Sequence, residues 1–541
     1  MLHKPIGVFL SVIAIGAYLR FDQFSIQVLA DDEWHALMRV IEGRPDGFLL
    51  SFGFSDHSIP LALLYWFEAS WFGLSELSMR WPMLLAGLLI LTLFPLRVSR
   101  TLGWRVALVF ALLLAISPLL INYSRQARPY GLTLLLGYVA HWSFLRYRTG
   151  GNGQIRTGLV YAVSAGLAGW LHLVSLPFVL APLIPAGFSA LLNWKADGGR
   201  AFRHIFGLAL PTALLLMLLI GPPLLVDPGA LLAKSGSDLP QWDTLAGVWH
   251  TWLGTPSVGA VLICLGLAVV GIPQLRRAEP LAGSILFGIA LTLAMLMVTQ
   301  PAWVHSPLAF GRYLLPAQPL LLLSVAVGAA RLVELIRQRW GTGAMSPALL
   351  LPALVLVAYT PLTETLSRPN SSTLHSYFQA DYRRDRHGAR EIVAARTPLS
   401  HWWAKLRQYP PASLVIAAAP YYFFSPRWDA PRWESVGGQR VIPGFLTGLC
   451  VDRRDGETPI DRRFSLHNAV HLADDNEMRA KGVDLIVFQK PYVDMGQPGS
   501  EPFGQETAHC LNALRSRFGT PQYEDELIAV FNKHKLAEDK R

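Results

Sequence analysis

Three consecutive carboxylates, Asp31, Asp32 and Glu33, follow the first apolar run of this 541-residue chain. A carboxylate can take a proton from a hydroxyl group, or orient that hydroxyl for attack on a substrate. The simpler interpretation is that Asp31 or Asp32 caps a short helix over 33–42, while Glu33 stabilises the positive end of that helix. Both interpretations require the carboxylates to lie at a helix end in a polar loop.

A second set of side chains could bind a phosphate beside these carboxylates. An arginine guanidinium presents a planar fork of donors that matches phosphate oxygens, and ionisable side chains at membrane depth usually mark a functional site. The alternative is that the arginines extend to lipid headgroups. The phosphate-binding candidates are Arg125, Arg128, Lys234, Arg312 and Tyr313. The candidates for acceptor contact or support are Asp56, His57 and His172, although His172 by itself is better explained as a hydrogen-bonded histidine at a membrane interface.

The composition places these residues in a membrane protein. Hydrophobic residues make up 52% of the chain and charged residues only 16%, with a mean hydropathy of +0.34, whereas a soluble domain has ~25% charged residues. The 11% of aromatic residues excludes a disordered chain. The net charge of +10 lies mostly between apolar runs, which indicates membrane topology and excludes a nucleic-acid-binding surface.

The chain divides into two regions, 1–362 and 363–541. The first contains apolar runs of about 16–22 residues, near the ~20 that cross a bilayer as a helix. The second has no run of that length but has three strand-like runs, so we expect a small water-exposed α/β domain. The strand-like runs are 414–419, 484–489 and 527–531. The eleven expected spanning helices are 5–21, 81–97, 106–122, 130–145, 157–173, 174–192, 205–225, 256–275, 281–299, 313–330 and 345–362.

One further apolar run, from Ser58 to Leu74, decides the topology. Glu68 within it is costly at bilayer depth, and its tyrosine and tryptophan residues favour the membrane interface. If the run lies flat on the outer surface, most of the arginines in the connections fall on one side, which the positive-inside rule makes cytoplasmic. With eleven spans, the N-terminus is then cytoplasmic and the C-terminal domain extracytoplasmic. If the run crosses instead, this charge pattern is lost.

Two further observations bear on the compartment. The first apolar run lacks a small-residue cleavage site, so we expect a retained helix in place of a signal peptide. Cys450 and Cys510 could pair in an oxidising compartment or remain two thiols, whereas Cys264 falls within an apolar run.

Four motifs in the first region resemble, in order, those of GT-C glycosyltransferases, specifically the branch of protein O-mannosyltransferases and lipid A aminoarabinose transferases. One departs from the family pattern, because an Asp-x-His-Pro-Pro stretch lacks one proline here. The matching segments are Asp32-Glu33, Asp56-His57 with Pro60, Ser124–Tyr130 and Arg312–Pro316.

The resemblance implies transfer of a sugar from a polyprenyl-phosphate carrier to an acceptor hydroxyl, with inversion at the anomeric carbon and without a nucleotide sugar. It implies Asp32 as the general base, with Glu33 and Asp31 as helpers or acceptor contacts; the doubled aspartate leaves Asp31 as an alternative base. Metal use varies in the superfamily. No Cys/His pair in this sequence has the spacing of metal ligands, and whether Asp32 and Asp56 bind a divalent ion stays an open question. The phosphate ligands that the resemblance implies are Arg125, Arg128, Arg312, Tyr313 and, on loop position alone, Lys234.

We therefore expect a polytopic α-helical glycosyltransferase of the inner (plasma) membrane, surrounded by membrane lipids, with its site under the extracytoplasmic α/β domain. Three other functions stay open: a transporter or flippase of lipid-linked sugars, a polymerase or ligase of lipid-linked glycans, and a non-catalytic scaffold. The acids are concentrated in the first outer loop and not inside the spans, which favours the transferase over a proton-coupled carrier. The acceptor could be a lipid, a glycan or a protein.

Overall fold

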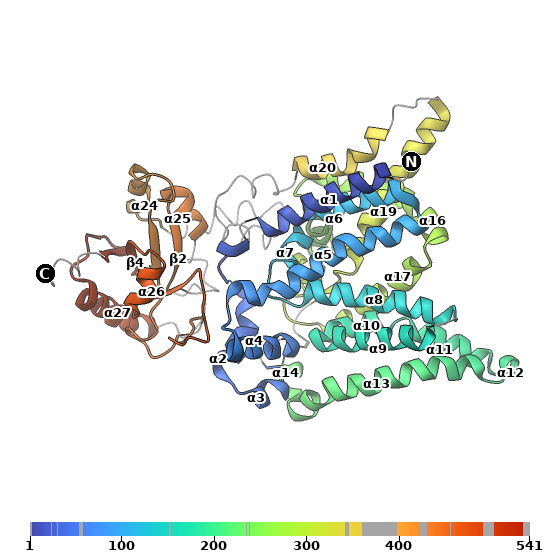
Figure 1. Ribbon diagram of the computed structural model, residues 1–541, viewed down its shortest axis with the longest axis horizontal. Helices are drawn as coiled ribbons and strands as arrows, with labels where there is room; N and C mark the ends of the chain where they lie inside the picture. Colours follow the sequence, from blue (N-terminus) through green and yellow to red (C-terminus); the bar gives the residue numbers. More distant parts are fainter. Residues whose placement is uncertain are drawn as a thin grey trace.

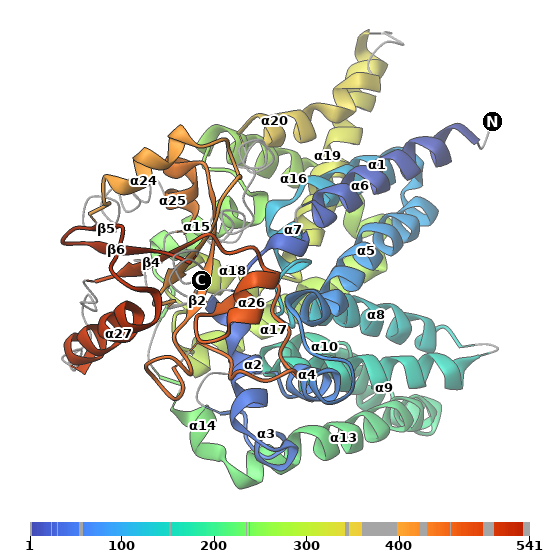
Figure 2. The same cartoon turned by 60° about the vertical axis from the view of Figure 1, so that its left-hand side comes forward.

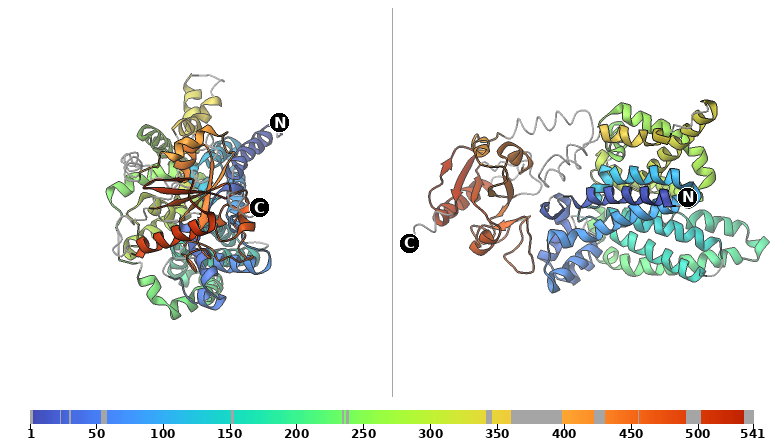
Figure 3. Two further views of the ribbon diagram at one scale, coloured as in Figure 1. Left: turned by 90° about the vertical axis from the view of Figure 1, so that its left-hand side faces the viewer. Right: turned by 45° about the horizontal axis from the view of Figure 1, so that its top comes forward.

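The computed structural model describes residues 3–22, 24–29, 31–53, 58–150, 153–233, 235–236, 239–340, 346–359, 398–421, 430–454, 456–490 and 502–533. Its first part is a helical module whose long helices lie side by side (Figure 1). Its second part is a C-terminal domain built on a sheet, which lies against one end of that module (Figures 1 and 3). The predicted boundary at residue 362 lies outside the described residues.

The helices of the module coincide with the predicted apolar runs, and short helices connect them. The helices are α1 (His3–Phe21), α2 (Trp34–Glu42), α3 (Pro45–Leu49), α4 (Ile59–Trp71), α5 (Glu76–Thr101), α6 (Gly103–Ile116), α7 (Pro118–Tyr123), α8 (Tyr130–Arg148), α9 (Gln154–Leu171), α10 (Leu176–Leu180), α11 (Leu183–Leu192), α12 (Trp194–Asp197), α13 (Arg200–Val226), α14 (Pro228–Leu232), α15 (Trp242–Leu253), α16 (Val258–Ala278), α17 (Pro280–Thr299), α18 (Pro307–Tyr313), α19 (Ala317–Trp340) and α20 (Leu351–Tyr359).

Six helical segments in the described part of the chain are long and apolar enough to cross a membrane, judged by length and composition. They are α5, Leu173–Leu192, α13, α16, α17 and most of α19. Shorter apolar helices cover Ile6–Phe21, Gly103–Ile116 and Ala348–Tyr359. The chain is thus a multi-pass membrane protein, while the count of eleven spans stays a prediction.

Prolines break or shorten several of the predicted spanning helices, including 174–192, in which α10 ends at Leu180 and α11 begins at Leu183 after Pro182. The run 106–122 ends as α6 at Ile116 and resumes at Pro118, because Ser117 is held extended (ψ 113°), as the residue before a proline usually is. The spanning helix predicted over 313–330 begins later than expected: α18 ends at Tyr313, with Arg312 in its last turn, and α19 begins only at Ala317. The interruptions at Ser117 and after Tyr313 leave polar residues at helix ends.

The segment that holds α2, α3 and α4 begins and ends at the same end of the module. Before α2, the carbonyl oxygen of Leu29 accepts a hydrogen bond from the hydroxyl of Tyr421 in the C-terminal domain (2.6 Å). After α4, Leu74 forms a parallel bridge with Phe464 of that same domain. With 13 residues, α4 is also shorter than the ~20 needed to span a bilayer.

The C-terminal domain has one six-stranded sheet with the order β3-β2-β1-β4-β6-β5. The first four of these strands are parallel, and β6 pairs antiparallel with both of its neighbours, β4 and β5. The three predicted strand-like runs are β1, β4 and β6. Sequence reasoning missed β2, because Pro443 and Gly444 within it disfavour a strand. The strands are β1 (Val415–Ala419), β2 (Arg440–Phe445), β3 (Val470–His471), β4 (Leu485–Gln489), β5 (Tyr523–Glu524) and β6 (Ile528–Asn532).

Helices cover both faces of this sheet. Because side chains alternate along a strand, Ile416 packs on one face with Trp403 and Trp433, whose rings stack at 5.1 Å. The other face packs against Leu514 of α27, and a disulfide joins Cys510 of this helix to Cys450. The helices of the domain are α24 (Trp402–Lys405), α25 (Ala430–Gly437), α26 (Asp475–Ala480) and α27 (Pro502–Phe518).

The C-terminal domain is attached to the helical module at the start of α5. The buried carboxylate of Glu76 accepts backbone hydrogen bonds from His467 (2.8 Å) and Asn468 (2.9 Å). Next to it, the backbone of Leu74 exchanges two 2.8 Å hydrogen bonds with Arg463 and Ser465. In Figure 2 this part of the domain, with α26, lies in front of α2 and α4. The domain therefore covers the polar end of the module.

Candidate functional site

Asp32 lies between two guanidinium groups from distant parts of the chain. Its Oδ2 is 2.6 Å from Nη1 of Arg312 and 3.8 Å from Nε of Arg128. Nη1 of Arg128 also donates to the Asp32 carbonyl oxygen (3.4 Å). The Asp32 side chain is 18% exposed and that of Arg128 only 6%. The structure thus brings together three of the predicted site residues, which with Tyr130 form what we call the Asp32 cluster.

Aromatic rings hold the two guanidiniums of the Asp32 cluster in place. Both guanidiniums lie 5.5 Å from the centre of the Tyr130 ring, within the range of cation–π attraction. The Tyr130 hydroxyl accepts a hydrogen bond from Nη2 of Arg128 (3.2 Å), and Arg312 also lies 5.5 Å from the Tyr313 ring. The His172 ring packs on Tyr130 and Tyr313, with centroid distances of 5.4 and 5.8 Å. Tyr313 and His172 thus support the arginines from behind.

Each member of the cluster comes from the end of a helix. Asp32 is in the 3₁₀ turn Asp31–Glu33 before α2, and Arg128 is in the loop between α7 and α8. Tyr130 is the first residue of α8, and Arg312 lies in the last turn of α18. Asp32 does not serve as the N-cap of α2: Glu33 holds that position without a side-chain cap hydrogen bond.

The surroundings of Asp32 favour its charged form. Burial alone would raise its pKa, but the positive charges of Arg312 and Arg128, with His35, outweigh burial and hold the pKa well below its usual range. Asp32 is therefore an ionised carboxylate at any physiological pH. In this state it is a good hydrogen-bond acceptor but a weak base.

The cluster has more positive than negative charge. Two guanidiniums face one carboxylate, so among the side chains that the structure describes one positive charge has no counter-charge in this mostly buried place. Within the described part of the chain, Nε of Arg128 and Nε of Arg312 are buried without a hydrogen-bond partner. Buried polar groups normally have partners, so this arrangement suits an anion with several acceptor oxygens, such as a phosphate.

Glu33 has a different environment from its neighbour Asp32. It is fully buried, and its two carboxylate oxygens form 2.7 Å hydrogen bonds with Nε and Nη2 of Arg80. The backbone amide of Ala127 also donates to it (2.8 Å). Sequence reasoning expected a helper or an acceptor contact, but a buried carboxylate in a bidentate pair is not available to a substrate. Glu33 instead ties the first polar segment to α5 and to the loop of Arg128.

Arg125 also differs from its predicted role. Its side chain is buried and donates to Oε1 of Gln27 and to the carbonyl oxygen of Leu19, both at 3.3 Å. It lies 6.0 Å from the centre of the Phe24 ring. Burial, followed by the nearby positive charge of Arg80, lowers the pKa of Arg125 to about 9. These contacts fix the segment after α1. Among the described residues, Arg125 makes no contact with Asp32.

Four predicted residues cannot be placed with their side chains. Lys234, Asp56 and His57 lie outside the described residues, and the side chain of Asp31 is likewise outside them. Of the two candidate bases, Asp31 and Asp32, only Asp32 has a described side chain, and its contacts with Arg128 and Arg312 are the basis for proposing it as the base. Among the described residues, no group of three or more His, Cys, Asp and Glu side chains could hold a metal ion.

Sequence reasoning missed three contributors to this site. Arg80 lies at the start of an apolar run, where a lone arginine was itself a signal of a buried partner. Tyr130 belongs to the second-loop motif, but its contacts with both arginines depend on folding. His35, with Nδ1 3.4 Å from Nη1 of Arg128, is one helical turn beyond the carboxylates and could have been inferred from that spacing.

No protein-family model matches this chain, and no curated protein matches it. Solved structures do: the oligosaccharyltransferase of Archaeoglobus fulgidus has 13% identity over 89% of this chain and 68% of its own, with a TM-score of 0.41. ArnT of Cupriavidus metallidurans, bound to undecaprenyl phosphate, has 13% identity over 97% of this chain and 98% of its own, with a TM-score of 0.44. Both belong to the GT-C superfamily, which the sequence motifs resemble.

Proposed function

We propose that this chain is an inverting glycosyltransferase that moves a sugar from a polyprenyl-phosphate carrier to an acceptor hydroxyl on the extracytoplasmic face of the inner membrane. The observation that carries the proposal is the Asp32 cluster, in which one ionised carboxylate is held between two guanidiniums. Among the described residues, the buried Nε groups of these guanidiniums have no hydrogen-bond partner. A carboxylate for the acceptor and an excess of positive charge for a leaving phosphate are the two groups that this reaction needs.

In this mechanism the donor phosphate replaces Asp32 in some of its contacts with Arg128 and Arg312. When the phosphate binds to Arg128 and Arg312, their positive charge is shared between two anions. The pKa of Asp32 then rises from its depressed value, because its main stabilising charges are partly neutralised. Phosphate binding thus converts a weak base into a stronger one at the moment when the donor is in place.

The transfer step follows from these positions. The acceptor oxygen forms a bond to the anomeric carbon from the face opposite the phosphate, and the bond from that carbon to the phosphate oxygen breaks. The acceptor proton moves to the Asp32 carboxylate, and the electron pair leaves with the phosphate, whose added charge the two guanidiniums stabilise. Attack from the opposite face inverts the anomeric carbon.

Two further observations support the extracytoplasmic side. The domain that covers the Asp32 end of the module contains the Cys450–Cys510 disulfide, and such bonds persist in oxidising compartments. The cytoplasmic side in this topology receives the arginine-rich helix connections, as the positive-inside rule requires.

The test uses purified full-length protein in lipid nanodiscs, a polyprenyl-phosphate sugar with a radiolabelled sugar group, and an envelope extract as acceptor. We expect labelled glycan product from the wild type and a loss of ~10²-fold or more in Asp32→Asn. The matched control is Asp243→Asn, which changes an exposed carboxylate at the start of α15. Equal product from Asp32→Asn and wild type would refute the assignment. Movement of labelled lipid across the bilayer without product would indicate a flippase instead.

A further inference from the structure

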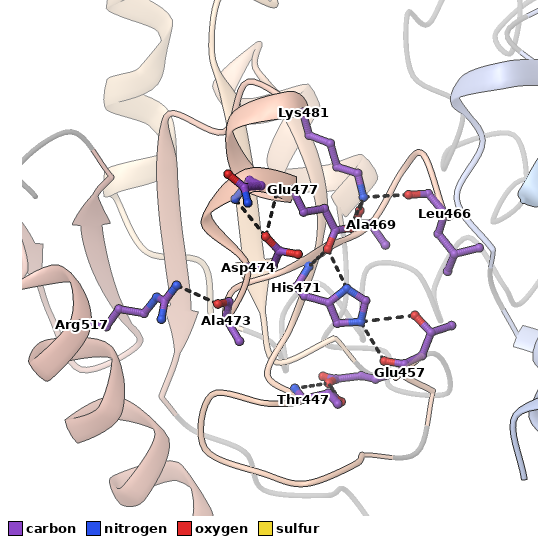
Figure 4. Close-up of polar contacts among 12 residues, drawn as sticks. Thr447, Glu457, Leu466, Ala469, His471, Ala473, Asp474, Glu477, Lys481 and Arg517 are labelled. Carbon is purple, nitrogen blue, oxygen red and sulfur yellow. Dashed lines mark hydrogen bonds and ion pairs between the residues drawn. The ribbon is translucent and has the colours of Figure 1, made fainter. Parts of the chain in front are cut away.

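The C-terminal domain has a polar cleft of about 460 Å³, which we call the α26 cleft. One wall is the loop 460–467, and the other is formed by His471 of β3 together with α26 and Lys481, which directly follows it (Figure 4). Its volume is within the ~300–1,000 Å³ of small-molecule sites. None of its lining residues belongs to the Asp32 cluster, so the cleft is a separate feature of the molecule.

A network of charged side chains forms the floor of the α26 cleft. Glu477 accepts a hydrogen bond from Nδ1 of His471 (2.7 Å) and a second one from Nζ of Lys481, and Nε2 of His471 lies 2.8 Å from the Thr458 carbonyl oxygen. Nζ of Lys481 also donates to the carbonyl oxygen of Leu466 in the opposite wall (2.7 Å). Figure 4 shows these contacts converging on Glu477 and Lys481. The two walls are thus fixed relative to one another before any ligand binds.

The rim of the α26 cleft has groups that are available to a ligand. Oδ1 of Asp474 accepts the backbone amides of Asn476 and Glu477, which leaves Oδ2 as an acceptor. Arg462 and His467 are exposed, and among the described residues neither makes a side-chain hydrogen bond. The Ser465 hydroxyl is also part of the lining. Donors and acceptors therefore alternate around the opening.

The charge of the lining points to a neutral ligand. Three carboxylates, from Asp461, Asp474 and Glu477, face the positive charges of Arg462 and Lys481 and the two histidines of the lining. This near balance differs from the excess of positive charge in the Asp32 cluster, and a free phosphate group would meet the carboxylates. Eight of the eleven lining residues have polar or charged side chains, and Ile460, Phe464 and Leu466 add apolar surface between them. A sugar ring, which has both hydroxyl groups and apolar C–H faces, suits this mixture better than an acyl chain, which would bury the charged groups without partners. A neutral ligand that carries many hydroxyl groups fits this lining best.

The α26 cleft is linked to the Asp32 cluster by direct packing. The His471 ring contacts Phe445 with centroids 5.2 Å apart, and Phe445 contacts Trp34 at 6.2 Å. Trp34 is the first residue of α2, directly after the turn that holds Asp32. On the other wall, the backbone of Ser465 is hydrogen-bonded to Leu74. A ligand in the cleft therefore lies in the part of the domain that covers the proposed site.

We propose that the α26 cleft binds the neutral saccharide part of the acceptor. That the bound saccharide is an acceptor depends on the proposed glycosyltransferase function, whereas saccharide binding at the cleft does not depend on it. The acceptor is then a glycan or glycolipid, whose sugar residues are held by the C-terminal domain while one hydroxyl reaches Asp32.

The test measures binding separately from transfer. Saturation-transfer NMR on the full-length protein in detergent uses four neutral disaccharides as probes: maltose, lactose, mannobiose and N,N′-diacetylchitobiose. Inorganic phosphate and a glycine-serine peptide serve as competitors of other chemistry. Ser465→Phe fills the cleft from its exposed wall, and Ser413→Phe places the same ring at an exposed position outside the lining. Circular dichroism and size-exclusion chromatography confirm that both variants fold.

We expect at least one disaccharide to bind the wild type and Ser413→Phe, and to bind Ser465→Phe at least ~tenfold more weakly, a difference of ~1.4 kcal/mol. In the transfer assay, Ser465→Phe should raise the KM for the acceptor while kcat stays within about twofold, a much smaller change than in Asp32→Asn. Absence of disaccharide binding, equal binding by Ser465→Phe, or competition by phosphate would overturn the proposal. Disaccharide binding without any transfer by the wild type would refute the proposed function and leave the saccharide site standing.

Discussion

Two neighbouring carboxylates show how different two buried acid–base contacts can be. Glu33 and Arg80 form a closed pair, with one positive charge for one negative charge and no exposure of either side chain. Asp32, the preceding residue, shares two guanidiniums and keeps 18% of its side chain exposed. The carboxylate oxygens of the closed pair are both engaged by Arg80, whereas the Asp32 cluster, judged on the described side chains, has an excess positive charge and two Nε donors without a hydrogen bond. A complete pair is a structural contact, and an incomplete one is a candidate binding site.

The largest effect is expected from opening the closed pair. Arg80→Ala leaves the carboxylate of Glu33 buried without its partner, which typically costs ~3–5 kcal/mol. We expect a sharp fall in the yield of folded protein and in Tm, measured by fluorescence-detected size-exclusion chromatography on a temperature series. The double variant Arg80→Met/Glu33→Leu removes both charges and should recover most of the loss. A single variant as stable as the wild type would show that Glu33 is not held by this pair.

A smaller effect, on binding and not on folding, is expected from the incomplete cluster. Arg312→Ala removes the donor of the 2.6 Å contact to Asp32 and one of the two proposed phosphate ligands. Because a hydrogen bond to a charged group contributes ~1.5–3 kcal/mol, the KM for the donor should rise about tenfold to a hundredfold in the transfer assay. Arg312→Lys keeps the positive charge but lacks the planar guanidinium, so its KM for the donor should lie between that of the wild type and that of Arg312→Ala. If Arg312→Ala lowers Tm as much as Arg80→Ala, the contrast between the two pairs is wrong.

The pH dependence should separate the charged from the neutral form of Asp32. In the wild type, the depressed pKa of Asp32 keeps it ionised, so kcat/KM should show no acid limb from this residue above about pH 4. The stability that its ion pairs contribute is present above the unfolded pKa of about 3.9 and is lost as pH falls through the lower folded pKa. Arg312→Ala removes a charge that lowers the pKa of Asp32, while burial, which raises this pKa, remains. The acid limb of kcat/KM should therefore move up by about one to two pH units. An unchanged limb would mean that Arg312 does not set the charge of Asp32.

The smallest effect is expected from an ion pair that faces solvent. Arg337 and Glu334 on α19 are 3.1 Å apart, and 51% of the arginine side chain is exposed. Arg337→Ala should change stability by only ~0.2–0.5 kcal/mol and leave transfer unchanged. It serves as the arginine control for the two preceding variants. A large loss here would show that arginine removal itself, and not burial or incomplete pairing, determines the outcome.

Much of this architecture could be predicted from the sequence because hydrophobic runs and charge placement are local signals. The apolar runs became helices, and the three β-branched runs became β1, β4 and β6. Pro118 interrupts the helix 106–122 that hydropathy alone predicts to be continuous, and the helix predicted from residue 313 begins only after Pro316. The strand β2 was missed, because its proline and glycine are compatible with a strand only once its neighbours are known.

The site was predictable in its residue types but not in its pairings. Asp32, Arg128 and Arg312 were identified from loops that carry charge next to apolar runs, and the structure brings them together. The sequence could not distinguish Asp32 from Glu33, because the difference lies in Arg80, whose position 47 residues away becomes a contact only on folding. Arg125 and Arg128 are three residues apart and end in different environments for the same reason.

The Glu76 contact has a consequence for how the chain is made. Its amide partners, His467 and Asn468, are synthesised 391 and 392 residues later, so these two hydrogen bonds can form only after the chain has been made as far as residue 468. A product that stops short would present a bare acidic group and unmatched backbone edges at the end of α5.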